Sequence, residues 1–555
     1  MSSSAEAGQA MRAIGKVAVI GAGVMGAGIA AQVANAGYPA LLLDMTEELA
    51  RTAREQLGRR TPQAFMHPSA ERLVTARGLA EGLTELATCD WIIEAVIEDA
   101  DVKRGLYRRI APHMASHAAL SSNTSTIRRA DLAASLPDAI ARRYLISHFF
   151  NPPRTMRLLE IVAGPDVAGG TLDAVIRFAD RALGKTVVRC RDRPGFIANR
   201  LGCFWMQTAI ALACEQGLSV EEADAVMGEP FGVPKTGVFG LADLVGIDLM
   251  PKVNGSLAAA LEKDDLFQTV NRPVPEVERM VDAGLTGRKA GGGFYRLQQG
   301  VGQGKEAIDL VRLTYRPFAP VKLRESTELF GATDRLGSYG TAVMARTLAY
   351  AGHLVGDAAE DAAAIDEAMR LGYNWRWGPF ELADRIGLDR LKTEITAAGL
   401  ALPPFMERAG RGPIHCGAVT LQRDGTYAKR LLPAGILSLA DIKANARAVF
   451  DNSPLQLWPL GEGIFCLEFA APHGLMDVEV LDGLAKALDH VEGHGRALVI
   501  YSDGDHFLTG AEMANLANLI REGNWSVLTS LIAKAQAVLD RLKRAPFPTV
   551  AALSG

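Results

Sequence analysis

A histidine and a glutamate form the first candidate for acid–base chemistry in this chain. His148 ends an apolar run that starts at Tyr144, and a second apolar run returns to Glu160. Asn151 and Pro152 lie between the runs and favour a turn, so the runs can pair and bring His148 beside Glu160. A neutral histidine held by a carboxylate is a general base with a fixed tautomer. A half-buried histidine with a satisfying carboxylate is the simpler interpretation of this stretch by itself.

A nucleotide-binding fingerprint upstream gives such a base a reaction to serve. Residues 16–44 read as a strand, a glycine turn, a helix and a second strand. The turn has G-x-G-x-x-G spacing with Gly21, Gly23 and Gly26, which lets backbone amides approach a pyrophosphate at the helix N-terminus. Asp44 ends the second strand, where an acid accepts the adenosine ribose hydroxyls. No arginine follows it directly, so the pattern favours NAD over NADP. A tight turn without a ligand is the weaker alternative.

Further polar residues follow the strands expected later in the chain. A buried strand at Trp91–Val96 is followed by Glu98 and Lys103, and residues 120–126 (LSSNTST) make a polar turn that contains Ser125. Small hydroxyl side chains at the C-terminal end of a strand are well placed to meet a ligand. Alternating strand and helix patterns continue to about residue 190 and predict an α/β domain with a doubly wound parallel sheet.

Helical patterns replace this alternation from residue 191 onward. PGFIANR (194–200) opens a long helix and puts Asn199 early on it, facing the sheet domain. GVFGLADLVGID (237–248) matches GPFELADRIGLD (378–389), which predicts two related helical units. The second unit lacks a PGFxxNR entry. We therefore expect the second copy to be structural and to fill, within one chain, an interface like that of a dimer.

These patterns divide the chain into six segments. They are a sheet domain (1–190), a helical domain (191–297), a linker (298–330), a second helical repeat (331–400), a connector without clear periodicity (401–454) and a new α/β region (455–555). The last region ends in mid-pattern, on the expected strand PTVAALSG.

The composition argues against several classes of protein. A net charge of −4 does not suit nucleic acid or an anionic membrane as the main partner, and no apolar run is long enough to span a bilayer. The six cysteines are scattered, without a CxxC pair or a histidine at ligand spacing. That usage favours a reducing cytoplasm and predicts neither a disulfide framework nor a metal site. The N-terminal residues MSSSAEAGQAMR lack the apolar core of a signal peptide.

The motifs GAGVMGAGIA, SNTST, HFFNP, PGFIANR and GRKAGGGFY occur in this order. With them, residues 14–297 resemble the NAD-dependent L-3-hydroxyacyl-CoA dehydrogenases of fatty-acid β-oxidation. Residues 331–400 resemble the tandem helical unit of multifunctional β-oxidation enzymes, and residues 455–555 resemble the first half of an enoyl-CoA hydratase (crotonase) fold. The resemblance implies a Rossmann-like sheet domain, NAD as cofactor and an acyl-CoA thioester as substrate. It also admits a thiolase partner and a homo-oligomer.

The resemblance implies a role for each matching residue. His148 would take the proton of the substrate 3-hydroxyl as hydride leaves C3, and Glu160 would orient His148. Ser125 and Asn199 would hydrogen-bond the substrate. The residues expected to line the NAD site are Gly21, Gly23, Met25, Gly26, Asp44, Glu98, Lys103, Ser125 and Asn151, with Lys289 reaching it from the glycine-rich turn 283–296.

The hydratase-like region matches only part of its family's site. In HFLTGAEM (506–513), the backbone amide of Ala511 would supply half of an oxyanion hole. The other half and the two glutamates that add water have no counterpart before Gly555, so we expect no hydration activity. Two further interpretations stay open. The sequence is a fragment of a bifunctional hydratase/dehydrogenase, which we favour over a binding appendage, or the chain is a non-catalytic acyl-CoA-binding scaffold.

Overall fold

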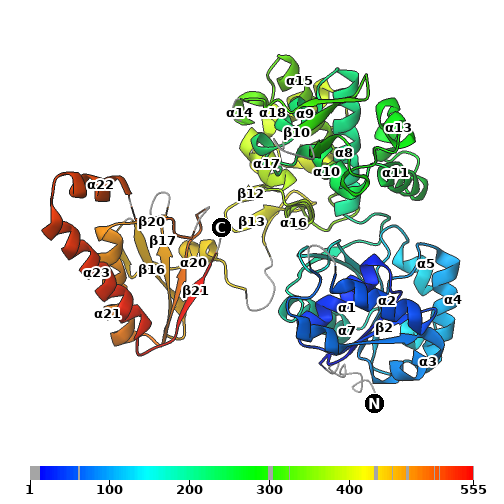
Figure 1. Ribbon diagram of the computed structural model, residues 1–555, viewed down its shortest axis with the longest axis horizontal. Helices are drawn as coiled ribbons and strands as arrows, with labels where there is room; N and C mark the ends of the chain where they lie inside the picture. Colours follow the sequence, from blue (N-terminus) through cyan, green and yellow to red (C-terminus); the bar gives the residue numbers. More distant parts are fainter. Residues whose placement is uncertain are drawn as a thin grey trace. The chain divides into compact units, whose positions relative to one another are not determined.

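The computed structural model divides into two compact units, Met1–Ala428 and Lys429–Gly555 (Figure 1). It describes residues 13–59, 63–297, 304–323, 326–430, 436–452, 454–470, 474–504, 507–511 and 513–553. The N-terminal residues MSSSAEAGQAMR, for which no targeting segment was predicted, lie outside the described residues.

An eight-stranded sheet with the order β3-β2-β1-β4-β5-β6-β7-β8 forms the first part of unit 1. Its strands are β1 (Val17–Ile20), β2 (Ala40–Asp44), β3 (Val74–Gly78), β4 (Trp91–Glu94), β5 (Ala119–Ser122), β6 (Tyr144–Phe149), β7 (Leu158–Val162) and β8 (Thr186–Cys190). The strands from β3 to β6 are parallel to one another, whereas β7 runs antiparallel to β6 and parallel to β8. The predicted parallel sheet is therefore mixed at one edge, because the segment 150–157 joins β6 to β7 without a crossover helix.

Both faces of this sheet are covered by helices. In β1, Val17 and Val19 belong to one buried cluster and Ala18 and Ile20 to another, so alternate side chains enter two cores. The first core packs against α1 (Val24–Asn35), α2 (Glu47–Leu57) and α7 (Gly169–Arg181), and the second against α4 (Ala100–Ile110), α5 (Arg129–Ala133) and α6 (Asp138–Ala141). The strand order reverses between β1 and β4, and ligands of such sheets bind at the carboxyl ends of the strands at this point.

The helical part of unit 1 contains two copies of one arrangement. A buried aspartate in each copy accepts two backbone N–H groups of a following helix. Asp224 accepts those of Phe239 and Gly240 at 2.7 and 3.1 Å, and Asp366 accepts those of Phe380 and Glu381 at 2.7 and 3.3 Å. The first copy comprises α8 (Ala198–Glu215), α9 (Val220–Val226), α10 (Gly237–Val245), α11 (Leu249–Ala260), α12 (Phe267–Val270) and α13 (Pro275–Asp282). The second comprises α15 (Arg335–Leu354), α16 (Ala362–Tyr373), α17 (Pro379–Ile386), α18 (Leu388–Ala397) and α19 (Pro404–Arg408).

The second copy extends beyond residue 400, into the segment predicted as a connector. Asp243 accepts the backbone N–H groups of Phe294 and Tyr295, both at 2.8 Å. In the same way, Asp384 accepts the N–H groups of Ile414 and His415 at 2.6 and 2.8 Å. The closing segment holds β12 (His415–Cys416), β13 (Val419–Leu421) and β14 (Tyr427–Lys429). These strands are too short for their periodicity to show in the sequence.

The predicted linker 298–330 also contains regular structure. β10 (Lys305–Asp309) and β11 (Thr314–Pro317) pair antiparallel with each other, and β10 pairs with β9 (Tyr295–Leu297). Ala307 and Ile308 of β10 are buried in the helical core. The glycine-rich residues 298–303 lie outside the described residues.

Unit 2 is a separate α/β layer. Its five-stranded sheet has the order β15 (Phe450–Asp451), β16 (Leu455–Gly461), β17 (Ile464–Phe469), β19 (Ala497–Tyr501) and β21 (Thr549–Ala552). β18 (Leu475–Met476) and β20 (Gly510–Ala511) form a separate pair, and the helices are α20 (Leu439–Asn445), α21 (Val478–His494), α22 (Met513–Arg521) and α23 (Trp525–Lys543). The predicted strands and helices of this region are present, whereas its crotonase character stays a prediction.

Candidate active site

His148 and Glu160 are cross-strand neighbours in the antiparallel pair β6–β7. His148 Nδ1 lies 2.8 Å from Glu160 Oε2, and both side chains are buried. An ionised carboxylate only accepts hydrogen bonds, so Nδ1 carries the hydrogen and Nε2 is left as the basic nitrogen. The pairing predicted from the two apolar runs is therefore present in the structure.

The other carboxylate oxygen of Glu160 is bound to the beginning of α8. Oε1 accepts the backbone N–H of Ile197 at 3.1 Å and that of Ala198 at 2.8 Å. The negative charge thus lies at a helix N-terminus, which stabilises it. The half-buried Asn199 follows Ala198 in the first turn of α8.

Aromatic rings enclose the histidine. The ring of Phe150 lies 4.5 Å from that of His148 and the ring of Phe196 lies 5.7 Å from it, measured between centroids. Phe196 has φ +48°, in the left-handed region that a bulky residue rarely adopts. This backbone conformation belongs to the PGF turn that leads into α8.

A side chain would have a different effect at each of the three glycines of the fingerprint. Gly21 has φ +102°, and a Cβ there would lie 2.6 Å from the Ala95 carbonyl oxygen. A Cβ on Gly26 would lie 1.8 Å from the Gly21 carbonyl oxygen. A Cβ on Gly23 would meet nothing within 4 Å. The packing of the chain requires the first and third glycines, whereas Gly23 leaves open space beside the N-terminus of α1, where a pyrophosphate would fit.

Asp44 lies at the carboxyl end of β2 beside this turn. Its Oδ2 accepts the backbone N–H of Ala22 at 2.6 Å, and its Oδ1 accepts that of Met45 at 2.7 Å. The acid expected to bind a ribose is therefore held against the glycine turn. Two other predicted NAD-site residues are accessible, since Met25 is half-buried and Asn151 is exposed.

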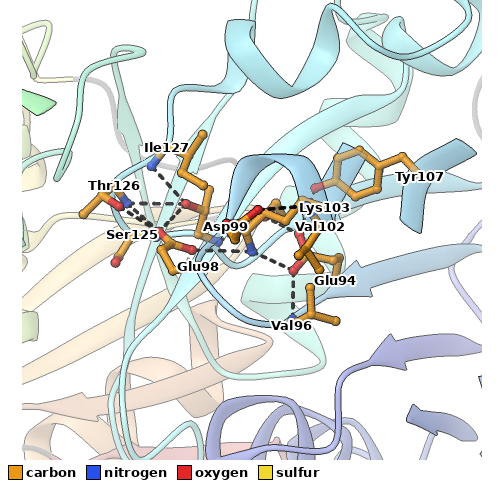
Figure 2. A network of polar contacts seen from close by, with 12 residues as sticks. Glu94, Val96, Glu98, Asp99, Val102, Lys103, Tyr107, Ser125, Thr126 and Ile127 are labelled. Carbon is orange, nitrogen blue, oxygen red and sulfur yellow. Dashed lines mark hydrogen bonds and ion pairs between the residues drawn. The ribbon is translucent and has the colours of Figure 1, made fainter. Parts of the chain in front are cut away.

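Glu98 organises the SNTST loop (Figure 2). Its Oε1 accepts the backbone N–H groups of Ser125 and Thr126 at 2.9 and 3.0 Å, and the hydroxyls of Thr124 and Thr126 at 2.5 and 2.9 Å. Burial raises the pKa of Glu98, but the charge of Lys103 and these hydrogen bonds more than offset it, so the pKa lies below its usual value. Glu98 is therefore an anion that shapes the loop.

Lys103 is buried and pairs with Glu98. Its side chain is 1% exposed, and its ammonium contacts Glu94 Oε1 at 2.7 Å and Glu98 Oε2 at 3.4 Å (Figure 2). Glu94 also accepts the hydroxyls of Tyr107 and Ser122 at 2.8 and 2.7 Å. In this structure the Lys103 ammonium supports Glu98, and a contact of Lys103 with NAD stays a prediction.

Sequence reasoning missed Glu94, Tyr107 and Ser122. One signal was available, because Glu94 interrupts the apolar run Trp91–Val96 and a buried strand tolerates an acid only when it is paired.

The side chains of two predicted residues, Ser125 and Lys289, are not part of this network. Ser125 is half-buried, its side chain points away from Glu98 in Figure 2, and its hydroxyl has no hydrogen-bond partner among the described residues. Lys289 is exposed in the short 3-10 helix η5 (Arg288–Ala290) of the helical part. Its contact with NAD stays a prediction.

Comparison with known families agrees with this geometry. The model for the 3-hydroxyacyl-CoA dehydrogenase NAD binding domain matches residues 16–193, and that for the 3-hydroxyacyl-CoA dehydrogenase C-terminal domain matches residues 195–297 and 337–406. The chain belongs to the 3-hydroxyacyl-CoA dehydrogenase family. Members of this family are NAD-dependent oxidoreductases. The two matches of the C-terminal domain correspond to the two helical copies.

Individual relatives cover different shares of the chain. A Rickettsia felis protein named as a fatty acid oxidation complex trifunctional enzyme is 33% identical over 540 residues, which is 96% of this chain and 73% of that protein. The human mitochondrial hydroxyacyl-coenzyme A dehydrogenase is 32% identical over 309 residues, 53% of this chain and 95% of that protein. The crystal structure of 3-hydroxybutyryl-CoA dehydrogenase from Escherichia coli K12 is 25% identical, with a TM-score of 0.54, and covers 69% of this chain and 94% of that one.

No helix among the described residues is long and apolar enough to cross a membrane. Within the same part of the chain, no three histidine, cysteine, aspartate or glutamate side chains gather as a metal ion would require.

Proposed function

We propose that the chain oxidises (S)-3-hydroxyacyl-CoA to 3-oxoacyl-CoA, with His148 as the general base. The 3-hydroxyl gives its proton to His148 Nε2, C3 loses a hydride and the C3–O bond becomes a carbonyl. Bound NAD supplies the hydride acceptor. The observation that carries this proposal is the buried His148–Glu160 pair at the carboxyl end of β6, in the same sheet as the glycine turn.

Glu160 is proposed to hold His148 in the basic tautomer and to stabilise the imidazolium that forms. Its hydrogen bonds to Ile197 and Ala198 prevent the carboxylate from rotating away from the histidine. This division of labour between a base and an orienting carboxylate is common to many acid–base sites.

Ser125 and Asn199 are proposed to hydrogen-bond the substrate. The Ser125 hydroxyl is not used by the described residues, and Asn199 adjoins Ala198, whose N–H binds Glu160. Contacts of this kind hold the reacting carbon against the cofactor, and this orientation accounts for a large share of the rate.

NAD is proposed to bind at the glycine turn. The space at Gly23, the N-terminus of α1 and the acid Asp44 suit a pyrophosphate and a ribose with free hydroxyls. Glu98 and Asn151 are proposed to meet the nicotinamide side of the cofactor, with Met25 packing beside it.

Unit 2 is proposed to be a crotonase-like layer. Support comes from its parallel strands β17, β19 and β21, from Ala511 in β20, and from the trifunctional relative, whose match covers nearly the whole chain. His506 and Glu512 of the HFLTGAEM segment lie outside the described residues. A role in fatty-acid oxidation follows from the same relative. Association with a thiolase, a homo-oligomer and a cytoplasmic location stay predictions.

The test is an NADH absorbance assay with acetoacetyl-CoA in the reducing direction and 3-hydroxybutyryl-CoA in the oxidising direction. We expect turnover in both directions. A chain that binds NAD and acyl-CoA without turnover would instead be the non-catalytic scaffold.

A further inference from the structure

The second helical copy contacts the segment that leads into α8. Asp357, between α15 and α16, binds Arg193 Nε at 2.8 Å and Arg200 Nη1 at 2.6 Å. The backbone N–H of Arg191 donates to the Ala358 carbonyl at 2.8 Å. Both ends of the segment 191–200 are therefore bound to the second copy.

Arg200 is the centre of a buried cluster. Its side chain is 3% exposed, and its Nη2 binds Asp265 of the first copy. Its Nε donates to the hydroxyl of Tyr350 at 3.1 Å, and that hydroxyl donates to Asp265 Oδ1 at 2.8 Å. All three guanidinium nitrogens have partners, and a buried charge satisfied in this way holds one position.

This cluster lies one residue beyond Asn199 in the first turn of α8. Arg200 shares this turn with Ala198, whose N–H donates to Glu160 at 2.8 Å. Glu160 in turn binds His148. A continuous path of hydrogen bonds and backbone therefore joins Asp357 to the proposed base.

Packing joins the second copy to the same place. A Cβ on Gly372 in α16 would lie 3.0 Å from a Leu158 methyl group in β7 and 3.5 Å from Ala198 Cβ. A Cβ on Gly202 in α8 would lie 1.9 Å from the hydroxyl of Tyr373. The end of α16 thus lies directly against the strand that carries Glu160 and against the helix that caps it.

We propose that the second helical copy is a positioning element of the dehydrogenase site. Asp357 acts through Arg200 to fix the first turn of α8, so that Ile197 and Ala198 hold Glu160 toward His148. This inference rests on the proposed function, and it differs from the expectation that the second copy is only structural. Asp357 and Arg200 are positioning residues and do not touch the reacting atoms.

The test is a double-mutant cycle with Asp357→Asn and Glu160→Gln, read as kcat for 3-hydroxybutyryl-CoA oxidation. In the chain that keeps Glu160, Asp357→Asn should misplace the Glu160 carboxylate and lower kcat by about tenfold or more. When Glu160 is already replaced, Asp357→Asn should lower kcat by less than about threefold, because the two residues act on one feature. The Kd for NAD should stay unchanged, since Asp357 does not contact the glycine turn.

Glu360→Gln is the matched control. Glu360 also belongs to the second copy and pairs with an arginine of the same segment, Arg191, at 3.2 Å, but its side chain is 80% exposed. We expect kcat to stay within about twofold of wild type, because exposed ion pairs contribute little.

Tyr350→Phe provides a second route if Asp357→Asn does not fold. It removes only the hydroxyl that lies between Arg200 and Asp265. It should lower kcat by about threefold when Glu160 is present and by less when Glu160 is already replaced. An unchanged kcat in Asp357→Asn, or an equal fold loss with and without Glu160, would overturn the positioning role. A wild-type chain that fails to oxidise the substrate would refute the proposed function and this role together.

Discussion

Glu160 and Ala198 are joined by a hydrogen bond of 2.8 Å from the backbone N–H at the start of α8 to the carboxylate of β7. Since the same carboxylate holds His148, the geometry of the base depends on two parts of the chain, the sheet and the helical region. A change in either part should reach the proton-transfer step.

Replacing Asp44 with asparagine should reduce the preference for NAD over NADP. The carboxylate repels a 2′-phosphate, and we expect it to discriminate by ~2 kcal/mol or more in kcat/KM. Asparagine keeps one oxygen for the N–H of Ala22, so the turn itself should survive. Kinetics with both cofactors check this, and equal efficiency of the wild type with NAD and NADP would contradict it.

Replacing Gly23 with alanine should weaken NAD binding, whereas replacing Gly26 with alanine should destabilise the fold. Gly23→Ala places a methyl group in open space, so the chain should fold normally while the Kd for NAD rises by about tenfold. Gly26→Ala places its methyl against the Gly21 carbonyl and should lower the free energy of unfolding by about 1–3 kcal/mol. Urea unfolding and NAD titration of both variants make the comparison, and normal NAD binding by Gly23→Ala would argue against the proposed pyrophosphate position.

Because of Asp224, the free energy of unfolding should fall as the pH rises through the weakly acidic range. Burial raises its pKa from 3.8 to about 7, although the N–H groups of Phe239 and Gly240 and the Tyr295 hydroxyl oppose this. A carboxyl group with a raised folded-state pKa stabilises the fold fully below the unfolded pKa, and this contribution is lost as pH rises to about 7. Asp224→Asn should flatten the loss of unfolding free energy between about pH 4 and about pH 7, an effect of at most about 4 kcal/mol. Equal slopes in both proteins would show that Asp224 titrates normally.

Removing unit 2 after residue 428 should leave 3-hydroxyacyl-CoA oxidation within about twofold of the full chain, because unit 1 is compact by itself. Unit 2 exposes Met513, Trp525 and Val550, which are 71%, 59% and 57% accessible, so the shortened chain should also be more soluble.

A protein made of residues 1–555 should not hydrate crotonyl-CoA. Residues 455–555 offer the Ala511 amide but contain no GGG-x-E segment. Hydration of crotonyl-CoA by the purified protein would refute this prediction. For the shortened chain, loss of 3-hydroxyacyl-CoA oxidation would show that unit 2 supports the dehydrogenase site.

Local patterns were enough to predict part of the site. The pairing of His148 with Glu160 follows from two apolar runs with an Asn/Pro turn between them, because such runs favour pairing with each other. The glycine turn and Asp44 are contiguous in sequence and follow from a known spacing.

Other features depend on contacts between residues far apart in the chain. The burial of Lys103 requires Glu94, and Asp384 binds Ile414 and His415 of the segment predicted as a connector. The link from Asp357 to Arg200 spans two helical copies. No local periodicity reports such contacts, so the structure was needed to find them.

The most direct test of the central claim is the activity of His148→Gln measured together with its affinity for NAD. Glutamine removes the basic nitrogen and keeps a polar side chain beside Glu160. We expect kcat for 3-hydroxybutyryl-CoA oxidation to fall by roughly two to four orders of magnitude, with the Kd for NAD unchanged. Retention of kcat within about tenfold of wild type, or loss of NAD binding in the same variant, would contradict the assignment of His148 as the base.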